Sequence, residues 1–555
     1  MPLELLIAGD NTHKKLGYHE TTLKSLVKVA SIFEGQEFPP EYYTIVDVAC
    51  GANHTLALVE LSNKHLSVRD GIDPVCCKLI YAAGSGLQGQ LGPSCCSWSR
   101  VVPTEFKFLD KPVPDPARLP FKEEHAAYKK VACGWYCSYI VFTEKDENDP
   151  SELPANDVLV SLGFHRDNTS GELGCPPPEG VSTEPKDSAK LCKHLISFAG
   201  VLTEAGLDAN AQVEILDIAA ARHHAVVGLL VRTGTEGRVI IAGWGSTDHG
   251  QISKVPEVDP SLLAPKRPAV LEPRLIWDWK TPDPASIRCK VRAGDHHTVV
   301  LVQGDVDGKT SILRCIGLNS DGQCAGTGDD DASAALLKYG VTPDHIADVT
   351  CNWSTTHFLV SRQKGDARTR PLILSCGRND QGQIGNGSRK STSSGKALVP
   401  AATNGGDFYL TTAFSEVEKL VSGSIHSLIL GKWHWESSEV KAEKGEKQVW
   451  GWGRNNEGAL AQGKEGLRTV HTEPMLLLAP KQKRIRRGAR HHPVNIWASH
   501  TSTIILAEVE EVEEVDKVDK VDKVDKVDKV DKVDKVDKVD KVDNVIFPRG
   551  RRPAF

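Results

Sequence analysis

The chain has 555 residues, of which 40% are hydrophobic and 25% are charged, and its formal net charge is -6 at pH 7. This composition is ordinary for a chain that buries a hydrophobic core. The small negative charge excludes a global field that would draw the protein to nucleic acid or to an anionic membrane, so any basic site must be local.

The amino-terminal segment and the apolar runs bear on localisation. Met1–Asp10 carries Glu4 inside a short apolar run and lacks the basic region and the small-residue cleavage site of a signal peptide. The longest apolar stretches, such as Ala225–Val231, are far shorter than the roughly 20 residues that cross a bilayer. We therefore expect a protein of the cytoplasm, the nucleus or both, with no membrane association.

A first signature, an apolar strand that runs into a glycine turn, occurs seven times along the chain. Its fullest copies are LIYAAGSGLQGQLG (Leu79–Gly92) and LILSCGRNDQGQIG (Leu372–Gly385). The other copies lie at Leu5–Gly17, Leu159–Gly174, Val239–Ile252, Ile312–Gly326 and Val449–Ala461. The first glycine of each copy is expected to adopt a positive φ or to allow close approach of two backbones, which glycine does at the least steric cost.

A second signature alternates with the first and also occurs seven times. Its clearest copy is VDVACGANHTLALV (Val46–Val59), in which an apolar step and a small residue precede Gly, a His-Thr pair and a strand. Alignment of the copies places one column at His54, Cys137, His224, His297, Thr355, His426 and Ser502. The next column holds Thr55, Ser138, Ala225, Thr298, Thr356, Ser427 and Thr503.

Seven copies of two strand-forming signatures predict many short antiparallel strands in a radially repeated unit. Such a unit cannot bury both faces alone, so neighbouring units must pack around a ring. The fold class is therefore all-β, a seven-bladed β-propeller over residues 1–507. Because the chain begins with a strand of the first signature and ends with one of the second, we expect the two termini to complete one blade and close the ring.

The alternation of GRNDQGQIG (Gly377–Gly385) with CGANHTLAL (Cys50–Leu58) resembles the regulator of chromosome condensation repeat over roughly residues 3–507. The degenerate copies and long insertions depart from the compact repeat of that family. Within the superfamily the chain is similar to the fungal alpha-tubulin suppressor group. That resemblance implies a protein-interaction scaffold whose partner is a small zinc-ribbon protein shared by diphthamide synthesis and tRNA wobble-uridine modification.

An alternative function follows from the founding member of the superfamily, which is a guanine-nucleotide exchange factor for a small Ran-type GTPase. The basic tail that precedes the first blade of that protein has no counterpart before Leu3. In either case we expect a monomer that binds protein partners on a propeller face. The long inserted segments Pro176–Gln212 and Lys254–Arg288 are expected to decorate one face and to set the partner.

No catalytic residue, cofactor or metal site is predicted. The recurring histidine pairs are interpreted as structural staples because a ring needs seven of them whereas chemistry needs one site. Cys50, Cys133 and Cys351 occupy one repeated position, and the 14 cysteines lack CxxC or Cys/His ligand spacing. We interpret them as small buried residues in a reducing compartment and expect neither disulfides nor zinc sites. GSGLQG (Gly84–Gly89) is one of seven repeat turns and not a dinucleotide fingerprint.

One strong basic cluster lies in the insertion of the last repeat. It comprises Lys481, Lys483, Arg484, Arg486, Arg487 and Arg490. Two interpretations remain open, a solvated loop and a site for nuclear import or for an acidic partner. No aromatic residues are interleaved with these charges, so sequence-specific recognition of nucleic acid is not expected.

Residues 508–555 form a low-complexity tail. Nine Val-Asp-Lys triplets begin at Val515, and the tail holds 15 acidic and 12 basic residues. Valine at every third position follows neither a strand face nor a helix face, and Val and Asp are poor helix formers. The tail is therefore predicted to be disordered and to add nothing to the core.

Overall fold

The computed structural model describes residues 1–29, 38–61, 78–93, 95, 107–109, 119–122, 125–144, 156–165, 168, 170–177, 192–252, 269–325, 330–337, 340–361, 371–391, 399–400, 402–403, 408–409, 414–433, 445–463, 469–480 and 489–512. In these ranges the chain is almost entirely β-structure, as the repeats predict. No helix in the described ranges is long and apolar enough to span a bilayer.

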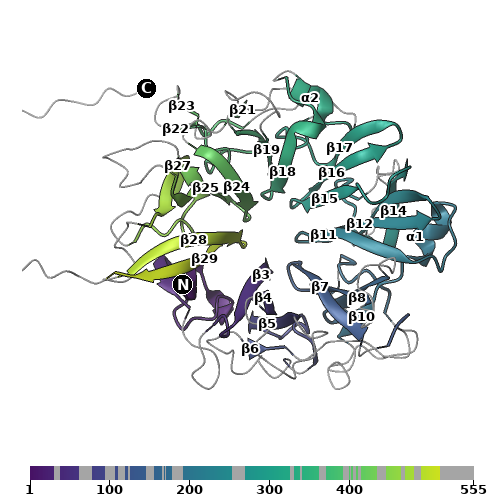
Figure 1. Ribbon diagram of the computed structural model, residues 1–555, viewed down its shortest axis with the longest axis horizontal. Coiled ribbons are helices and arrows are strands. Elements are labelled where there is room, and N and C mark those ends of the chain that lie inside the picture. Colours follow the sequence, from purple (N-terminus) through teal and green to yellow (C-terminus); the bar gives the residue numbers. More distant parts are fainter. Residues whose placement is uncertain are drawn as a thin grey trace, which may run out of the picture. The chain divides into compact units, whose positions relative to one another are not determined.

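Seven antiparallel sheets stand around a common centre, with one strand of each sheet innermost (Figure 1). From the innermost strand outward, the first three blades are β3 (Tyr43–Cys50), β4 (His54–Leu61), β5 (Lys78–Gly84) and β6 (Lys107–Phe108); β7 (Ala126–Cys133), β8 (Ser138–Glu144), β9 (Asp157–Leu162) and β10 (Lys193–Leu195); and β11 (Val213–Ala220), β12 (His224–Thr233), β13 (Glu236–Ser246) and β14 (Ala269–Thr281).

The remaining blades follow the same order. They are β15 (Arg288–Ala293), β16 (His297–Val306) and β17 (Lys309–Gly317); β18 (Ile346–Cys351), β19 (Thr355–Val360), β20 (Leu372–Gly377) and β21 (Val399–Pro400); β24 (Phe414–Ser422), β25 (His426–Trp433), β26 (Lys447–Arg454) and β27 (Val470–Leu478); and β28 (Ala489–Ala498), β29 (Ser502–Glu511), β1 (Leu3–Asp10) and β2 (Thr22–Lys28). Short elements outside the blades are β22 (Ala402–Thr403), β23 (Phe408–Tyr409), α1 (Ala199–Glu204), α2 (Ser333–Leu337) and two 3-10 turns at Thr12–Lys14 and Pro343–His345.

The glycine turns end the third strand of each blade as predicted. Gly84 has φ 101°, and a Cβ atom there would lie 2.3 Å from the carbonyl oxygen of Asn53. Gly317 repeats this geometry in the fourth blade, with φ 109° and a contact of 2.3 Å to the carbonyl oxygen of His296. Both the positive φ and the close approach require glycine, which explains why the residue recurs at this point of the repeat.

The hydrophobic core lies between neighbouring blades. One buried cluster joins Leu56 and Ile80 of the first blade to Ile140 of the second. Another joins Leu428 of the sixth blade to Ile505 of the seventh. Each blade therefore depends on both neighbours for burial, as predicted for a unit too thin to form a core alone.

The two termini close the ring, which confirms the prediction from the first and last signatures. β1 pairs with β29 in an antiparallel register that runs from Leu3↔Glu508 to Gly9↔Ser502. The buried carboxylate of Glu4 adds polar contacts across this sheet, 3.0 Å from His491 Nε2 in β28 and 2.9 Å from Lys28 Nζ in β2. β29 ends at Glu511, beyond the predicted domain boundary at Ala507.

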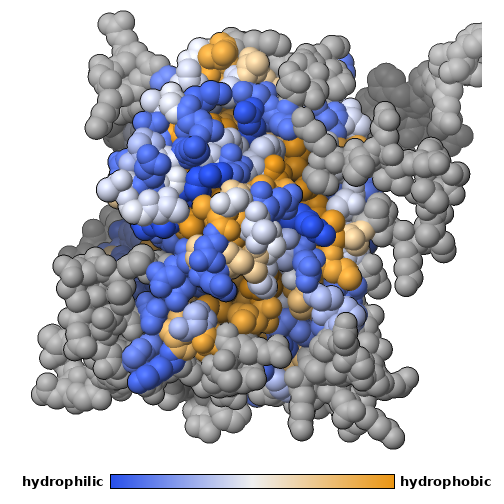
Figure 2. Space-filling view, turned by 90° about the vertical axis from the view of Figure 1, so that its right-hand side faces the viewer, coloured by the Kyte–Doolittle hydropathy of each residue, from blue (hydrophilic) through white to orange (hydrophobic). Residues whose placement is uncertain are grey.

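The inserted segments differ from the prediction because they contribute outer strands and a helix to the blades. Pro176–Gln212 contains β10 and α1, and Lys254–Arg288 contains the long outer strand β14. Figure 2 shows the side of the ring that carries β14 and α1, where hydrophilic and hydrophobic residues are interleaved. A mixed surface of this kind is ordinary, so this side of the ring does not by itself mark a binding site.

Candidate functional site

The centre of the ring carries a column of charged residues that the repeat places three positions before the Cys50 column. Going round the ring, the column is Asp47, Lys130, Asp217, Lys290, Asp348, Lys419 and Asn495. Acidic and basic side chains alternate through six blades. Because seven is odd, strict alternation cannot close, and the neutral Asn495 stands between Lys419 and Asp47. We call this set the charge ring.

Local backbone geometry accompanies the charge ring. In six of the seven innermost strands the register shifts immediately before the residue of the ring, for example between Ile45 and Asp47 and between Ile215 and Asp217. Such a bulge bends the strand and re-aims the next side chain. β15, which carries Lys290, keeps a continuous register with β16.

Neighbouring blades are linked through the charge ring. Lys130 Nζ lies 2.7 Å from Asp217 Oδ1, and Lys290 Nζ lies 2.9 Å from Asp348 Oδ1. Arg292 adds a second cation at 2.7 Å from Asp217 Oδ2. Burial alone would raise the pKa of Asp217, but the charges of Arg292 and Lys130 outweigh it and hold the pKa below its usual value.

Around Asn495 the charges of the charge ring are less fully compensated by opposite charges. Lys419 Nζ donates to Asn495 Oδ1 at 2.8 Å and lies 4.6 Å from the centroid of the Trp497 ring. Burial lowers the pKa of Lys419 to about 8. Burial also raises the pKa of Asp47, more than Lys419 and Lys130 lower it. The two charged residues that flank Asn495 are therefore the least compensated members of the ring.

On one face of the ring, aromatic side chains meet over its centre. They belong to a column formed by the middle residue of each turn between an innermost strand and the next strand. The column is Ala52, Trp135, Arg222, Asp295, Trp353, Ser424 and His500. Backbone hydrogen bonds join several of these turns, including Asp295 N–H to the Trp353 carbonyl at 2.8 Å and Ser424 N–H to the His500 carbonyl at 3.0 Å. We call the propeller face that carries these turns the turn face.

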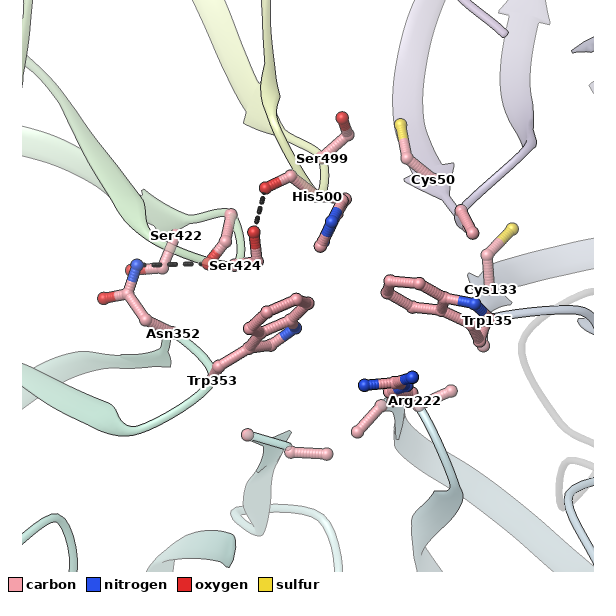
Figure 3. A pocket seen from close by; sticks show the side chains of 18 of the residues that line it. Cys50, Cys133, Trp135, Arg222, Asn352, Trp353, Ser422, Ser424, Ser499 and His500 are labelled. Atoms are coloured by element: carbon pink, nitrogen blue, oxygen red, sulfur yellow. Dashed lines mark hydrogen bonds between the residues drawn. The ribbon is translucent and has the colours of Figure 1, made fainter. Parts of the chain in front are cut away.

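Trp135 of the second blade and Trp353 of the fifth point toward each other, with His500 beside both (Figure 3). The ring centroids of Trp135 and Trp353 are 5.9 Å apart, and that of His500 lies 4.7 Å from the first and 4.6 Å from the second. The guanidinium carbon of Arg222 lies 4.8 Å from the centroid of Trp135. We call these four residues the aromatic cap.

Around the cap lies a cavity of about 180 Å³, also lined by small residues of the seven turns. Burial raises the pKa of the Cys50 thiol to about 11 and that of Cys351 to about 12, so both remain protonated at neutral pH. Burial, together with the charge of nearby Lys15, lowers the pKa of His500 to about 3, so the imidazole is neutral. Protonated thiols and a neutral imidazole of this basicity are poorly suited to nucleophilic or acid-base catalysis.

The predicted histidine staples are present, and their hydrogen bonds join neighbouring blades. The Nε2 atoms of His54, His224, His297 and His426 lie 2.8, 3.1, 3.0 and 3.4 Å from the hydroxyl oxygens of Ser138, Thr298, Thr356 and Thr503 in the following blades. The Thr356 hydroxyl in turn donates to the Gln323 carbonyl of the previous blade at 2.7 Å. The Ser138 and Thr503 hydroxyls likewise donate to the Gln90 and Ala459 carbonyls at 2.7 and 2.6 Å, so three of these staples form a buried relay from histidine to hydroxyl to backbone.

Where the histidine is replaced, an indole takes over the contact between blades. Trp244 Nε1 donates to the Glu172 carbonyl at 2.9 Å, across the boundary at which Cys137 stands in the histidine column. Trp452 Nε1 donates to the Gln383 carbonyl at 2.7 Å, where Thr355 stands in that column. At the closing blade the fully buried Lys15 lies 2.6 Å from Asp10 Oδ2 and donates to the Ala52 carbonyl at 3.1 Å.

The predicted basic cluster falls mostly outside the described residues. The cluster residues outside the described ranges are Lys481, Lys483, Arg484, Arg486 and Arg487. Arg490 is described and lies in β28, with a guanidinium nitrogen 3.6 Å from Glu510 Oε2. The charge ring and the aromatic cap were not predicted from the sequence. Both are visible as columns once the second signature is aligned, but their proximity follows only from closure of the ring.

Comparison with known proteins identifies the fold. No family model matches the chain, and no curated protein matches its sequence. Human WBSCR16 is similar in structure, with a TM-score of 0.54 at 15% identity over 92% of this chain and 99% of that one. Prp20p from Saccharomyces cerevisiae, a protein that binds Gsp1p and histones, has a TM-score of 0.53 at 15% identity over 93% of each chain. The seven-bladed propeller predicted from the two repeated signatures is therefore confirmed as the fold of this chain.

Proposed function

We propose that the protein is a non-enzymatic protein-interaction scaffold that binds a protein partner on its turn face. The observation that carries this proposal is the aromatic cap at the centre of that face, together with the adjacent Tyr136. The Tyr136 side chain is 42% exposed, and its ring lies 6.2 Å from that of Trp135. Aromatic residues and arginine gathered at the centre of a surface are the composition of an interaction hot spot.

The cap is also held in place before any partner arrives. Trp135 and Trp353 are half-buried and contact His500, and the turns that carry these three residues are hydrogen-bonded through their backbones to neighbouring turns. Rigid aromatic groups lose little conformational entropy when a partner docks, so a larger share of the contact energy appears as affinity. The pKa values of Cys50, Cys351 and His500 further support a binding role over a catalytic one.

The experiment compares two exposed tyrosines on opposite faces. Tyr136 lies on the turn face. Tyr42, which is 41% exposed, precedes β3 and therefore lies at the end of that strand opposite the turn. We expect the tagged wild-type protein, purified from its native cell, to retain a stoichiometric partner that Trp135→Ala/Tyr136→Ala loses and Tyr42→Ala keeps. Equal melting temperatures of the three proteins exclude unfolding as the cause. A partner retained equally by all three would contradict the proposal.

Two classes of partner are proposed for the first binding assays. A small zinc-ribbon protein is implied by the sequence resemblance to the alpha-tubulin suppressor group, and this assignment rests on that resemblance alone. The alternative is a small GTPase on which the propeller acts as an exchange factor. The likeness to Prp20p, which binds Gsp1p, supports testing it. Either partner places the protein in the cytoplasm or the nucleus.

A further inference from the structure

Two histidines and a cysteine come together at the outer part of the second blade, and none of them belongs to the aromatic cap. His165 follows β9, Cys175 follows the glycine turn that ends at Gly174, and His194 lies in β10. One potential ligand atom of each residue lies within 4.8 Å of the other two. The ring centroids of His165 and His194 are 4.4 Å apart.

The imidazole of His165 is unsatisfied in an unusual way. Both of its ring nitrogens are buried, and neither has a hydrogen-bond partner among the described residues. A buried polar atom that loses its water without gaining a partner destabilises the folded state. Two such atoms on one ring, aimed among other donor groups, are expected where an ion or an ordered water completes the site.

His194 is oriented as a metal-binding histidine is. Its Nε2 atom lies 2.8 Å from the carbonyl oxygen of Gly163, to which it donates a hydrogen bond. That bond fixes the tautomer and leaves the Nδ1 lone pair available. Metal-ligating histidines almost always anchor their second nitrogen to a carbonyl or carboxylate in this way. Cys175 has a free thiol, half-buried at the same site.

We propose that His165, Cys175 and His194 bind one Zn²⁺ ion, which ties the segment after β9 to the outer strand β10. Imidazole nitrogen and thiolate sulfur are the ligands that zinc prefers, whereas calcium and magnesium require oxygen ligands. Zinc bond lengths of about 2.0–2.3 Å put tetrahedral ligand atoms roughly 3.3–3.6 Å apart. The three side chains therefore close by about 1 Å on binding, and a water molecule takes the fourth position.

A second cluster of ligand-type residues, Asp248, His249 and His296, does not carry the same inference. Asp248 Oδ1 already accepts hydrogen bonds from Ser246 Oγ at 2.6 Å and from Gln251 Nε2 at 3.0 Å. His249 is exposed. These contacts account for the cluster as part of a polar turn, and His249 thereby supplies a control position.

The zinc site differs from the expectation that cysteine spacing gave. Cys175 and His194 are 19 positions apart and lie in different parts of the blade, so the pair does not form a short Cys/His motif that could be recognised in the sequence. The repeat brings the end of β9, its following turn and β10 together only after the blade has formed. The assignment concerns this blade alone, and its three ligands are separate from the four residues of the aromatic cap.

The test titrates the metal-free full-length protein with Co²⁺ and then with Zn²⁺ in the presence of a competing chelator. We expect one Co²⁺ per chain with the near-ultraviolet band of a cobalt-thiolate bond, displaced by one Zn²⁺. Cys175→Ser should lose that band, and His165→Gln and His194→Gln should each weaken zinc binding at least 10-fold. His249→Gln should leave stoichiometry and affinity unchanged.

Folding of each variant is checked by circular dichroism. If a variant does not fold, the wild-type protein still decides the matter. Zinc should raise its melting temperature by an amount that grows with the logarithm of zinc concentration, since an ion that binds only the folded state stabilises it. Less than half an equivalent of bound metal in the wild type, or an unchanged cobalt-thiolate band in Cys175→Ser, would overturn the proposal.

Discussion

Lys130 Nζ lies 2.7 Å from Asp217 Oδ1 across a blade boundary, whereas Asp47, which occupies the same column of the charge ring, has no ion-pair partner among the described residues. The same residue type therefore occupies two electrostatically opposite settings in one repeated position. This contrast gives a matched pair of substitutions.

Asp217→Asn is expected to lower the free energy of unfolding at pH 7 by about 3 kcal/mol, because it leaves Arg292 and Lys130 without their carboxylate. Asp47→Asn is expected to be neutral or to stabilise by up to about 1 kcal/mol. The pKa of Asp47 is raised in the folded state, so its stability contribution is present at low pH and lost as pH rises through that pKa. Urea denaturation measures both values. Equal losses in the two variants would refute this account of the charge ring.

The histidine staples predict a specific acid sensitivity. His297→Ala should lower the free energy of unfolding at pH 7 by about 1–3 kcal/mol, since the Thr356 hydroxyl loses its buried partner. Burial lowers the pKa of His297 to about 3, against about 6.5 when unfolded. Below pH 6.5 the unfolded chain takes up a proton that the folded chain excludes, so this contribution falls by about 1.4 kcal/mol per pH unit down to about pH 3.

The slope of stability against pH between 6 and 4.5 should therefore be smaller in His297→Ala than in the wild type by about 1.4 kcal/mol per unit. Urea denaturation at several pH values measures it. His249→Gln, at a histidine outside the staple column, is the control. If His297→Ala folds with unchanged stability but loses a partner, that histidine belongs to a binding site and not to the scaffold.

Two truncations test where the propeller ends. Removal of residues 513–555 should leave thermal stability unchanged, because the Val-Asp-Lys composition offers no core. Removal of residues 508–555 should cost about 1.5–3 kcal/mol, since it deletes buried Val509 and the pairing of Glu508 with Leu3. Differential scanning calorimetry of both chains measures this. A large loss in the shorter deletion would show that the tail packs on the propeller.

The exchange-factor alternative predicts accelerated release of GDP, whereas the scaffold proposal does not require it. An exchange factor must bind the nucleotide-free GTPase more tightly than the loaded one. We expect micromolar protein to leave GDP release from a Ran-type GTPase essentially unchanged in a fluorescent-nucleotide assay with excess GTP. A genuine exchange factor is the positive control. Acceleration of several hundred-fold, abolished by Trp135→Ala/Tyr136→Ala, would establish the alternative.

The fold could be predicted from the sequence because each signature reports a local requirement. Glycine recurs at positions such as Gly84 and Gly317 because the backbone there has a positive φ. The two terminal segments complete one blade because each of them contains only half of the repeat. The histidine column does form buried hydrogen bonds between strands, but the sequence did not identify their partners. Local pattern shows that His54 and Thr55 are adjacent, but it does not show that His54 bonds to Ser138 of the next blade.

The aromatic cap could not be predicted because it, too, depends on contacts between blades. Trp135 and Trp353 are 218 positions apart. In the column to which both belong, His500 is the one other aromatic residue. Only the geometry of a closed ring converts one residue from each of several repeats into a single cluster. The alternating charges were within reach of an alignment, since Asp47, Lys130 and Asp217 stand at one fixed offset from the second signature.

Pairing of Leu5 with Leu506 also has a consequence for biosynthesis. At 5–20 residues per second, the ribosome makes the partner of β1 roughly 25–100 s after β1 itself has emerged. Throughout that interval the nascent chain carries an unpaired strand edge at its beginning, a surface prone to intermolecular pairing. Blades one to six can assemble while translation continues, but the seventh must wait for the last strand. A message truncated before the codons for Ser502–Glu511 therefore yields an open ring with two reactive edges, which makes it a substrate for chaperones and proteases.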